Sequence, residues 1–425
     1  MKLLIICYSY PPALTPRAFR WSAIAAQLVR RGHEVHVVCQ AAGAAGRGTD
    51  GVVVHRVRDW LLDGASRVSL GNPSVTPKTA GSWRKWLRAG VRMLWRALFW
   101  PDYACGWVIP AARAARALHA EHRFDWIISV SHPFTGHVVG LLAKARTQGA
   151  RWFVDIGDPF HLMDEPSPNN RRLYHWLNHA VEARVVKGAD VLCVTTEATQ
   201  HLYAMHFGLP AQRFVVVPPL LSLPTLPPPS PRTADAPLRL VFVGTLYRKL
   251  RSPRFLLACL TALQTALWES LPRRGVELHF YGTLNDCADE IAACPPAIRE
   301  AVVVHGMVAR AEALQAMVDA DVLVNIGNDS ESQLASKVIE YMAVGKPILN
   351  LVSLEHDASE LALDGYPAVL TLVRDAGLPP EAIAALHDFV LAPPSVPPEL
   401  AAEVGERYSA ETITAHYAAM LEAQR

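Results

Sequence analysis

A cation and a carboxylate stand three residues apart in the segment 336–347, which reads Ser-Lys-Val-Ile-Glu-Tyr-Met-Ala-Val-Gly-Lys-Pro. Lys337 and Glu340 would share one face of a helix, because residues three apart are neighbours on a helical surface. The cation can meet a phosphate, and the carboxylate can accept hydrogen bonds from sugar hydroxyls. The pair therefore suits a nucleotide-sugar.

A second group of cations follows the strand predicted over 238–244. Gly244 permits a phosphate to approach the backbone closely because it has no side chain, and Arg248, Lys249 and Arg251 follow shortly after it. Cleavage of a nucleoside-diphosphate sugar without a metal needs cations and backbone donors that stabilise the leaving diphosphate. The alternative is that this cluster is only the solvated start of a helix.

Polar side chains also follow three predicted strands in the first half of the chain. They are Arg17 and Arg20, then His132, then Asp158. We expect them at the carboxyl edge of a parallel sheet, where His132 would orient a sugar or accept a proton. The alternatives are two exposed helix arginines, a loop histidine without a role and an ordinary polar loop around Asp158.

The predicted elements that position these residues form two alternating series of strands and helices, which favours an α/β fold of two doubly wound, Rossmann-like domains. We predict an N-terminal domain over 1–217, a linker with eight prolines over 218–237, a C-terminal domain over 238–405 and a C-terminal helix over 406–425. Proline lacks a backbone donor, so the linker can join neither a helix interior nor a sheet centre. Strands are predicted at 3–8, 34–39, 51–56, 126–130, 152–155, 191–194 and 214–217, then at 238–244, 276–281, 301–305 and 321–326.

Composition indicates a globular protein. The chain has 425 residues, of which 51% are apolar and 19% charged, which argues against disorder. A net charge of +2 argues against a nucleic-acid partner, because chains that bind nucleic acids usually carry a strong excess of positive charge. Seven scattered cysteines without a Cys-x-x-Cys pair favour a reducing compartment and argue against a structural zinc site.

In order and spacing these motifs resemble glycosyltransferase family 4, a retaining group with the GT-B architecture of two Rossmann-like domains facing a central cleft. The first half carries Tyr10-Pro11-Pro12 and Gly157-Asp158-Pro159-Phe160, and the second half carries Val243-Gly244-Thr245-Leu246-Tyr247 before the segment 336–347. The resemblance covers nearly the whole chain. It implies a bacterial transferase of hexosyl type acting in polysaccharide or lipid-linked glycan synthesis, with a C-terminal helix that can return to the N-terminal domain.

The resemblance also implies roles. No cofactor and no metal are expected, and the acceptor is a glycan or a polyprenyl-linked glycan. The catalytic residues would be His132, Arg251 and Lys337, with Arg251 first on the diphosphate and Glu340 on the ribose. Arg17, Arg20 and Asp158 would lie on the acceptor side. The donor site would comprise Gly244, Thr245, Tyr247, Arg248, Arg251, Ser332, Ser336, Lys337 and Glu340.

One position departs from the family's pattern of two glutamates separated by seven residues. Glu340 fits the second, but Ser332 stands at the first, and Glu331 is one residue early. In the family the first carboxylate usually contacts the transferred sugar. This substitution motivates an alternative, a catalytically inactive GT-B scaffold or partner subunit. A nucleotide-sugar epimerase, which shares the architecture, is a further alternative.

Two acidic patterns invite a metal-binding interpretation that we do not favour. Asp319-Ala320-Asp321 ends a predicted helix and enters a strand, whereas a metal-binding Asp-x-Asp pair should leave a strand for a loop. The spacing of three between Asp155 and Asp164 is interrupted by Pro159, which breaks any helix that would align the side chains.

Residues 83–100 predict a basic, aromatic helix with five cations, four tryptophans and no acidic residue. The four arginines, Arg84, Arg88, Arg92 and Arg96, recur every four residues and would form one stripe. Such a helix can lie among lipid headgroups, where each cation contributes roughly 1 kcal/mol on an anionic leaflet. We therefore expect a cytoplasmic protein held peripherally on the inner face of the cell membrane. The alternative is a helix packed on its own core with solvated arginines.

Overall fold

The structure, a computed structural model, divides the chain into two compact units, one of Met1–Pro218 with Ala410–Arg425 and one of Pro219–Ser409. Within the described residues, no helix has both the length and the apolar composition needed to cross a membrane. Ser332, Ser336 and most of the predicted basic helix, 83–97, lie outside the described residues. Those are 1–13, 15–41, 46–47, 50–61, 98–163, 167–221, 223–233, 235–267, 275–328, 334, 337–355 and 357–423.

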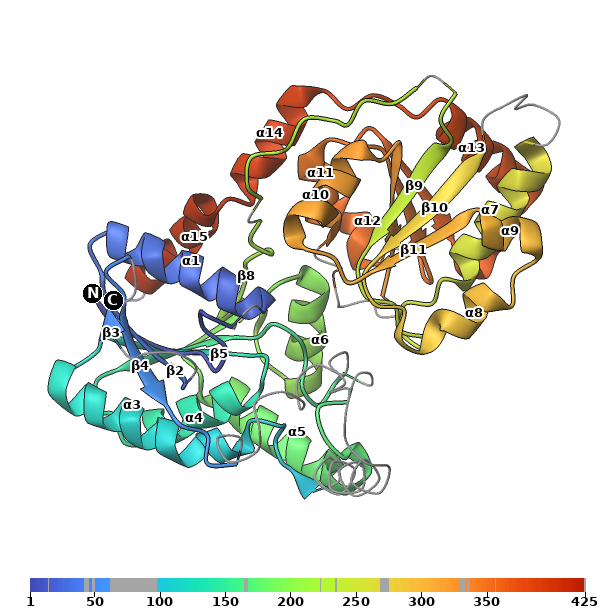
Figure 1. Ribbon diagram of the computed structural model, residues 1–425. Coiled ribbons are helices and arrows are strands. Elements are labelled where there is room, and N and C mark those ends of the chain that lie inside the picture. Colours follow the sequence, from blue (N-terminus) through green and yellow to red (C-terminus); the bar gives the residue numbers. More distant parts are fainter. Residues whose placement is uncertain are drawn as a thin grey trace, which may run out of the picture. The chain divides into compact units, whose positions relative to one another are not determined.

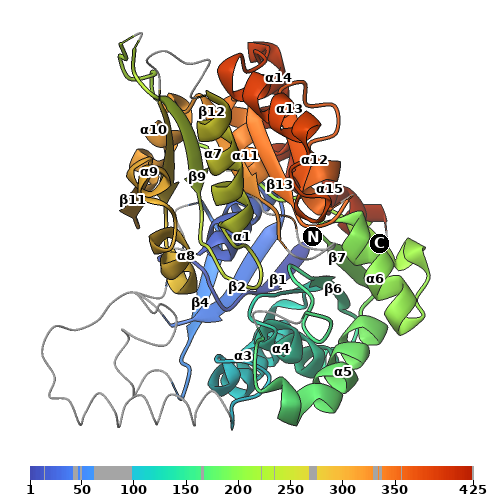
Figure 2. The same ribbon diagram turned by 90° about the vertical axis from the view of Figure 1, so that its right-hand side faces the viewer.

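An eight-stranded sheet forms the first unit, in the order β3-β4-β2-β1-β5-β6-β7-β8. Every neighbouring pair is parallel except β3 and β4. The chain winds outward from β1 through β2 and β4, which lie side by side in Figure 2, and then outward from β5 in the other direction. The strands are β1 (Lys2–Ile6), β2 (Glu34–Gln40), β3 (Gly46–Arg47), β4 (Val53–Val57), β5 (Trp126–Val130), β6 (Arg151–Asp155), β7 (Val191–Val194) and β8 (Phe214–Val216).

Helices cover both faces of this sheet (Figure 1), with α3, α4 and α5 on one face and α1 and α15 on the other. Successive side chains of β1 point to opposite faces of the sheet. Those of Leu4 and Ile6 pack in the core between the sheet and helices α3 to α6. The last helix, α15, packs on α1, so the expected return of the C-terminal helix to the N-terminal domain is confirmed. The helices are α1 (Pro16–Arg30), η1 (Cys105–Trp107), α3 (Val108–His122), α4 (Thr135–Lys144), α5 (Arg171–Gly188), α6 (Glu197–Phe207), η2 (Ala211–Arg213) and α15 (Ala410–Ala423).

A six-stranded parallel sheet forms the second unit, in the order β11-β10-β9-β12-β13-β14. It is doubly wound as well, with its change of direction between β9 and β12. The predicted fold class is therefore confirmed in both halves. The strands are β9 (Leu238–Val243), β10 (Val276–Tyr281), β11 (Val302–Gly306), β12 (Val322–Ile326), β13 (Ile348–Val352) and β14 (Val369–Val373).

Side chains of β9 alternate between two cores in the second unit. Leu240 and Phe242 pack with α7 and α13, whereas Val241 and Val243 pack with α10, α11 and α14. The helices therefore sandwich this sheet from both sides. They are α7 (Arg254–Leu267), η3 (Asn285–Cys287), α8 (Ala288–Ala292), α9 (Pro296–Glu300), α10 (Arg310–Asp319), α11 (Lys337–Val344), α12 (Ala358–Ala362), η4 (Arg374–Ala376), α13 (Pro380–Leu391) and α14 (Pro398–Arg407).

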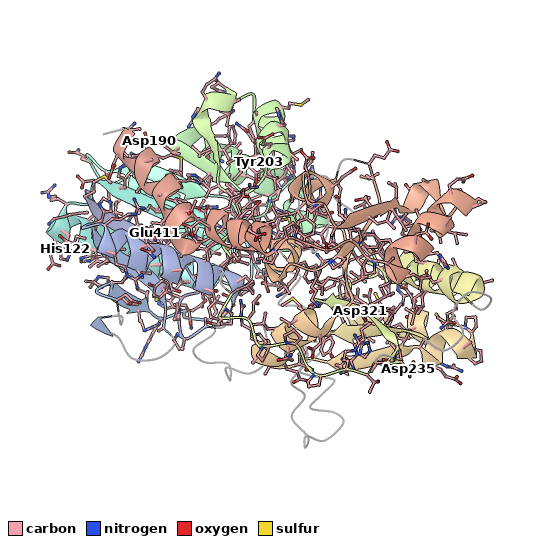
Figure 3. All side chains as sticks on the ribbon, turned by 90° about the horizontal axis from the view of Figure 1, so that it is seen from above. His122, Asp190, Tyr203, Asp235, Asp321 and Glu411 are labelled. Atoms are coloured by element: carbon pink, nitrogen blue, oxygen red, sulfur yellow. The ribbon has the colours of Figure 1, made fainter. Side chains whose placement is uncertain are left out.

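The proline-rich stretch packs along the second unit. The Ser230 amide and hydroxyl donate to the two carboxylate oxygens of Asp319, at 2.7 Å each. Arg232 Nη1 lies 2.8 Å from Oδ2 of Asp321, which is labelled in Figure 3. The carboxylates of the Asp-x-Asp pattern thus hold this stretch, which belongs to the second unit from Pro219 onward.

Candidate active site

Tyr341 fixes α11 at the carboxyl end of β9. Its side chain is buried, and its hydroxyl accepts a hydrogen bond from the Val243 amide at 3.0 Å and lies 3.3 Å from the Val243 carbonyl. Burial, with a smaller effect of Glu340, raises the pKa of the Tyr341 phenol, so the hydroxyl stays protonated. This contact places α11 beside Gly244.

The predicted pair on α11 is formed. Lys337 Nζ and Glu340 Oε2 are 2.6 Å apart, and both side chains are only partly exposed, at 33% and 18%. The first turn of this helix therefore presents an ammonium and a carboxylate together. Chemically, the two can meet a phosphate and a hydroxyl of one ligand.

Arg251 is a cation with few partners. Its Nη2 donates to Asn328 Oδ1 at 2.7 Å, and its buried Nε has no partner among the described residues. Burial lowers the pKa of the guanidinium, and Tyr341 and Tyr247 partly oppose this shift. No ion pair joins Arg251 to a carboxylate of the described residues. A buried charge without such a partner is costly, so within this part of the chain the position favours an anionic ligand.

A cavity of about 270 Å³ opens beside Arg251 at the carboxyl ends of β12 and β13. Gly327 and Ser353 line the cavity just after these two strands end. Among the described residues, no carboxylate lines the cavity. Clustered cations raise the local concentration of anions. The cationic lining comprises Arg248, Lys249, Arg251, Arg254 and Arg374.

Glu290 forms ion pairs with two of these cations. Its carboxylate lies 2.9 Å from Arg254 Nε and 3.5 Å from Arg248 Nε. Arg248 also forms an ion pair with Asp289 and donates to the Asp286 carbonyl. The guanidinium of Arg248 therefore joins the loop after β9 to α8, and Arg251 has fewer contacts with carboxylates of the described residues. The predicted contact of Arg248 with the donor stays a prediction.

A tight turn presents Arg251. The Arg251 amide donates to the Tyr247 carbonyl at 2.7 Å, and the Tyr247 amide donates back at 3.2 Å. The Tyr247 side chain is exposed, whereas Thr245 is half-buried. Their donor contacts stay predictions, as do those of Ser332 and Ser336 outside the described residues.

In the first unit the central buried charge is Asp155, at the end of β6. Its carboxylate accepts from Trp21 Nε1 and from the Tyr417 hydroxyl, each at 2.9 Å, and lies 3.9 Å from Arg17 Nη1. Sequence reasoning weighed Asp155 only as a metal ligand. The available signal was a carboxylate closing an apolar strand, because a buried charge there requires partners.

Arg20 points into the first unit, and its predicted place on the acceptor side stays a prediction. Its side chain is buried, its Nη1 donates to the Pro218 carbonyl at 2.8 Å, and its Nη2 donates to the Tyr417 hydroxyl at 3.1 Å. Arg20 therefore joins α1 to α15 within the first unit. Its place on α1 was predicted, but its inward direction was not.

The other predicted residues of the first unit lie at the carboxyl edge of the sheet. His132 follows β5 and is exposed, with its ring 6.1 Å from that of Tyr103. Asp158 follows β6 and is exposed. Arg17, in the first turn of α1, is partly buried, and its Nη1 lies 3.9 Å from Asp155 Oδ2. The structure places these groups where a ligand can reach them, and their roles stay predictions.

Comparisons with known proteins agree with this arrangement. Residues 18–219 match the glycosyl transferase 4-like domain, and residues 237–406 match the glycosyl transferases group 1 family. Among solved structures the chain is similar to sucrose-phosphate synthase from Thermosynechococcus elongatus, with a TM-score of 0.61, 16% identity and coverage of 100% of this chain and 99% of that chain. It is also similar to the lipopolysaccharide outer core galactosyltransferase WaaB in its apo form, with a TM-score of 0.60, 13% identity and full coverage of both chains. Among curated proteins none matches significantly.

Proposed function

The chain belongs to the GT-B glycosyltransferases that join a glycosyl transferase 4-like domain to a group 1 domain, and on this premise we propose that it uses a nucleoside-diphosphate sugar. In this proposal a hexose passes to an acceptor in polysaccharide or lipid-linked glycan synthesis. The anomeric configuration is retained and no metal takes part in the transfer.

The observation that carries the proposal is Arg251, a partly unpaired cation beside a cationic cavity. The leaving diphosphate gains negative charge as the glycosidic bond breaks, so nearby cations lower the barrier. We assign this role to Arg251 and Lys337, with backbone at Gly244 approaching the diphosphate. Glu340 accepts hydrogen bonds from the ribose. The acceptor hydroxyl attacks from the face that the diphosphate leaves, and His132 orients the sugar or accepts the proton.

The proposed acceptor is a glycan or polyprenyl-linked glycan at the inner face of the cell membrane, with Arg17 and Asp158 on the acceptor side. The sequence of residues 83–100 supports the membrane part through its five cations and four tryptophans. Sedimentation with anionic liposomes tests it. Replacing Arg88, Arg92 and Arg96 together by glutamate should abolish binding, and equal binding would refute the membrane contact.

A donor screen with the purified chain tests the transferase proposal. Transfer to an acceptor, or hydrolysis of one nucleotide-sugar, supports it. Binding without turnover supports the inactive scaffold that Ser332 motivates, and interconversion of the donor sugar supports an epimerase.

A further inference from the structure

Three side chains that commonly bind metals converge at the amino-terminal edge of the first sheet. Glu34 and His36 begin β2, and His122 ends α3. One ligand atom from each lies within 4.8 Å of the others. Glu34 Oε1 is 3.3 Å from His36 Nε2 and 3.7 Å from His122 Nδ1. A carboxylate oxygen and two imidazole nitrogens thus surround one point.

The remaining polar atoms of these side chains are held by neighbours, as the outer contacts of metal ligands usually are. Lys2 Nζ lies 3.4 Å from Glu34 Oε2, which leaves Oε1 for the cluster. His55 Nε2 lies 3.0 Å from His36 Nδ1. In the tautomer of His36 that carries its proton on Nδ1, the Nε2 lone pair faces Glu34. The outer nitrogen of the third residue, His122 Nε2, lies 3.8 Å from the carboxylate of the preceding glutamate.

Access also fits a bound cation. The Glu34 side chain is 40% exposed and the His122 side chain 27%, whereas His36 is buried. An ion can therefore enter from solvent and meet a fixed inner ligand.

We propose that Glu34, His36 and His122 bind a divalent transition-metal ion, for which Zn²⁺ is the first candidate. Two imidazoles and one carboxylate form a ligand set that suits Zn²⁺, and a water can take the fourth tetrahedral position. The ion joins the start of β2 to the end of α3. His132 and Asp158 follow the carboxyl ends of β5 and β6, at the opposite edge of the sheet from this cluster. The ion therefore stabilises the first unit and takes no part in sugar transfer.

A second histidine group in the same unit supplies an internal comparison. Its rings pack with centroids 4.5 to 5.8 Å apart, but within the described residues its nitrogens are not among the groups whose ligand atoms lie within 4.8 Å. Zinc bound there would be unrelated to the proposed site. The group consists of His161, His175, His179 and His206.

Zinc titration of the full chain, after treatment with a chelator, tests the proposal by calorimetry and elemental analysis. We expect the bound Zn²⁺ to fall by one ion per chain in both Glu34→Gln and His122→Ala, which replace partly exposed side chains. His416→Ala, at an exposed position of α15, should bind as the unmodified chain does. His55→Gln, which loses an outer contact, should bind about 10- to 100-fold more weakly.

Co²⁺ supplies a readout that does not depend on comparing affinities. The unmodified chain and His416→Ala should give visible absorption bands with Co²⁺ that His122→Ala lacks. Absence of Zn²⁺ binding by the unmodified chain would overturn the proposal. So would Zn²⁺ binding that survives in His122→Ala and disappears in His175→Ala/His179→Ala.

Discussion

The guanidinium of Arg17 occupies the space that a side chain at position 157 would fill. A Cβ added to Gly157 would stand 1.4 Å from Arg17 Nη2 and 2.1 Å from its Cζ. Arg17 also lies 3.9 Å from Asp155 Oδ2. Asp155 and Gly157, at and just after the end of β6, therefore determine where the Arg17 guanidinium lies, and this is the cation that we place on the acceptor side.

Gly157→Ala should displace Arg17 without unfolding the first unit, because the clash is with the far end of a flexible side chain. Loss of a charge-assisted contact costs about 1.5–3 kcal/mol, so kcat/KM for the acceptor should fall by about tenfold or more. Donor affinity should not change. Gly405→Ala, where an added Cβ meets nothing within 4 Å, is the control. Unchanged acceptor kinetics would remove Arg17 from the acceptor site.

Tyr341→Phe should weaken donor binding as well as stability. The change leaves the buried Val243 amide without its partner, which costs about 1–3 kcal/mol, and releases α11 from β9. Tyr366→Phe is a matched control, because its buried hydroxyl donates to the Lys346 carbonyl at 2.8 Å, after α11 has ended. Equal donor affinities in the two variants, measured by calorimetry, would contradict the role given to α11.

The local parts of this account could be predicted from sequence. Strands at Trp126–Val130, Val191–Val194 and Val276–Tyr281 have the predicted bounds, because each is an apolar run closed by polar or turn residues. The ion pair of Lys337 with Glu340 follows from helical spacing alone.

The remaining parts depend on contacts between distant segments. Arg20 turns inward to Tyr417, which is 397 positions away, and Arg248 turns to Asp286, which is 38 positions away. Helix periodicity places a side chain on a face but does not say which partner covers that face. These contacts of Arg20 and Arg248 were therefore beyond sequence reasoning.

Tyr417→Phe should destabilise the first unit. Its hydroxyl donates to Asp155 and accepts from Arg20, so its loss leaves two buried charged groups short of a partner, at a cost of about 1–3 kcal/mol. Ten of the eleven tryptophans precede residue 219, so fluorescence during urea unfolding reports on this unit. Tyr174→Phe removes a more exposed hydrogen bond and should cost less. Equal midpoints would contradict the anchoring of α15.

Acid should destabilise the first unit through His137. Burial lowers the pKa of this imidazole to about 3, whereas the value in an unfolded chain is about 6.5. Between these values the unfolded state binds the extra proton, so stability falls as pH falls, by up to about 1.4 kcal/mol per pH unit. Above pH ~6.5 the group contributes no slope.

His137→Gln should flatten this dependence when urea midpoints are compared at pH 7 and pH 5. His416→Gln, at an exposed position, should retain it. Identical pH dependence in the His137 variant and the unmodified chain would show that His137 is not the responsible group.

The affinity of a nucleoside diphosphate for Arg251→Met tests the central claim most directly. Calorimetry with the diphosphate that the unmodified chain binds best should give a Kd about 10- to 100-fold higher, the equivalent of one lost charge-assisted contact. Arg299→Met, which changes an exposed cation on α9 outside the cavity, should bind normally. An unchanged Kd for a folded Arg251→Met would contradict the assignment of this cavity to the diphosphate.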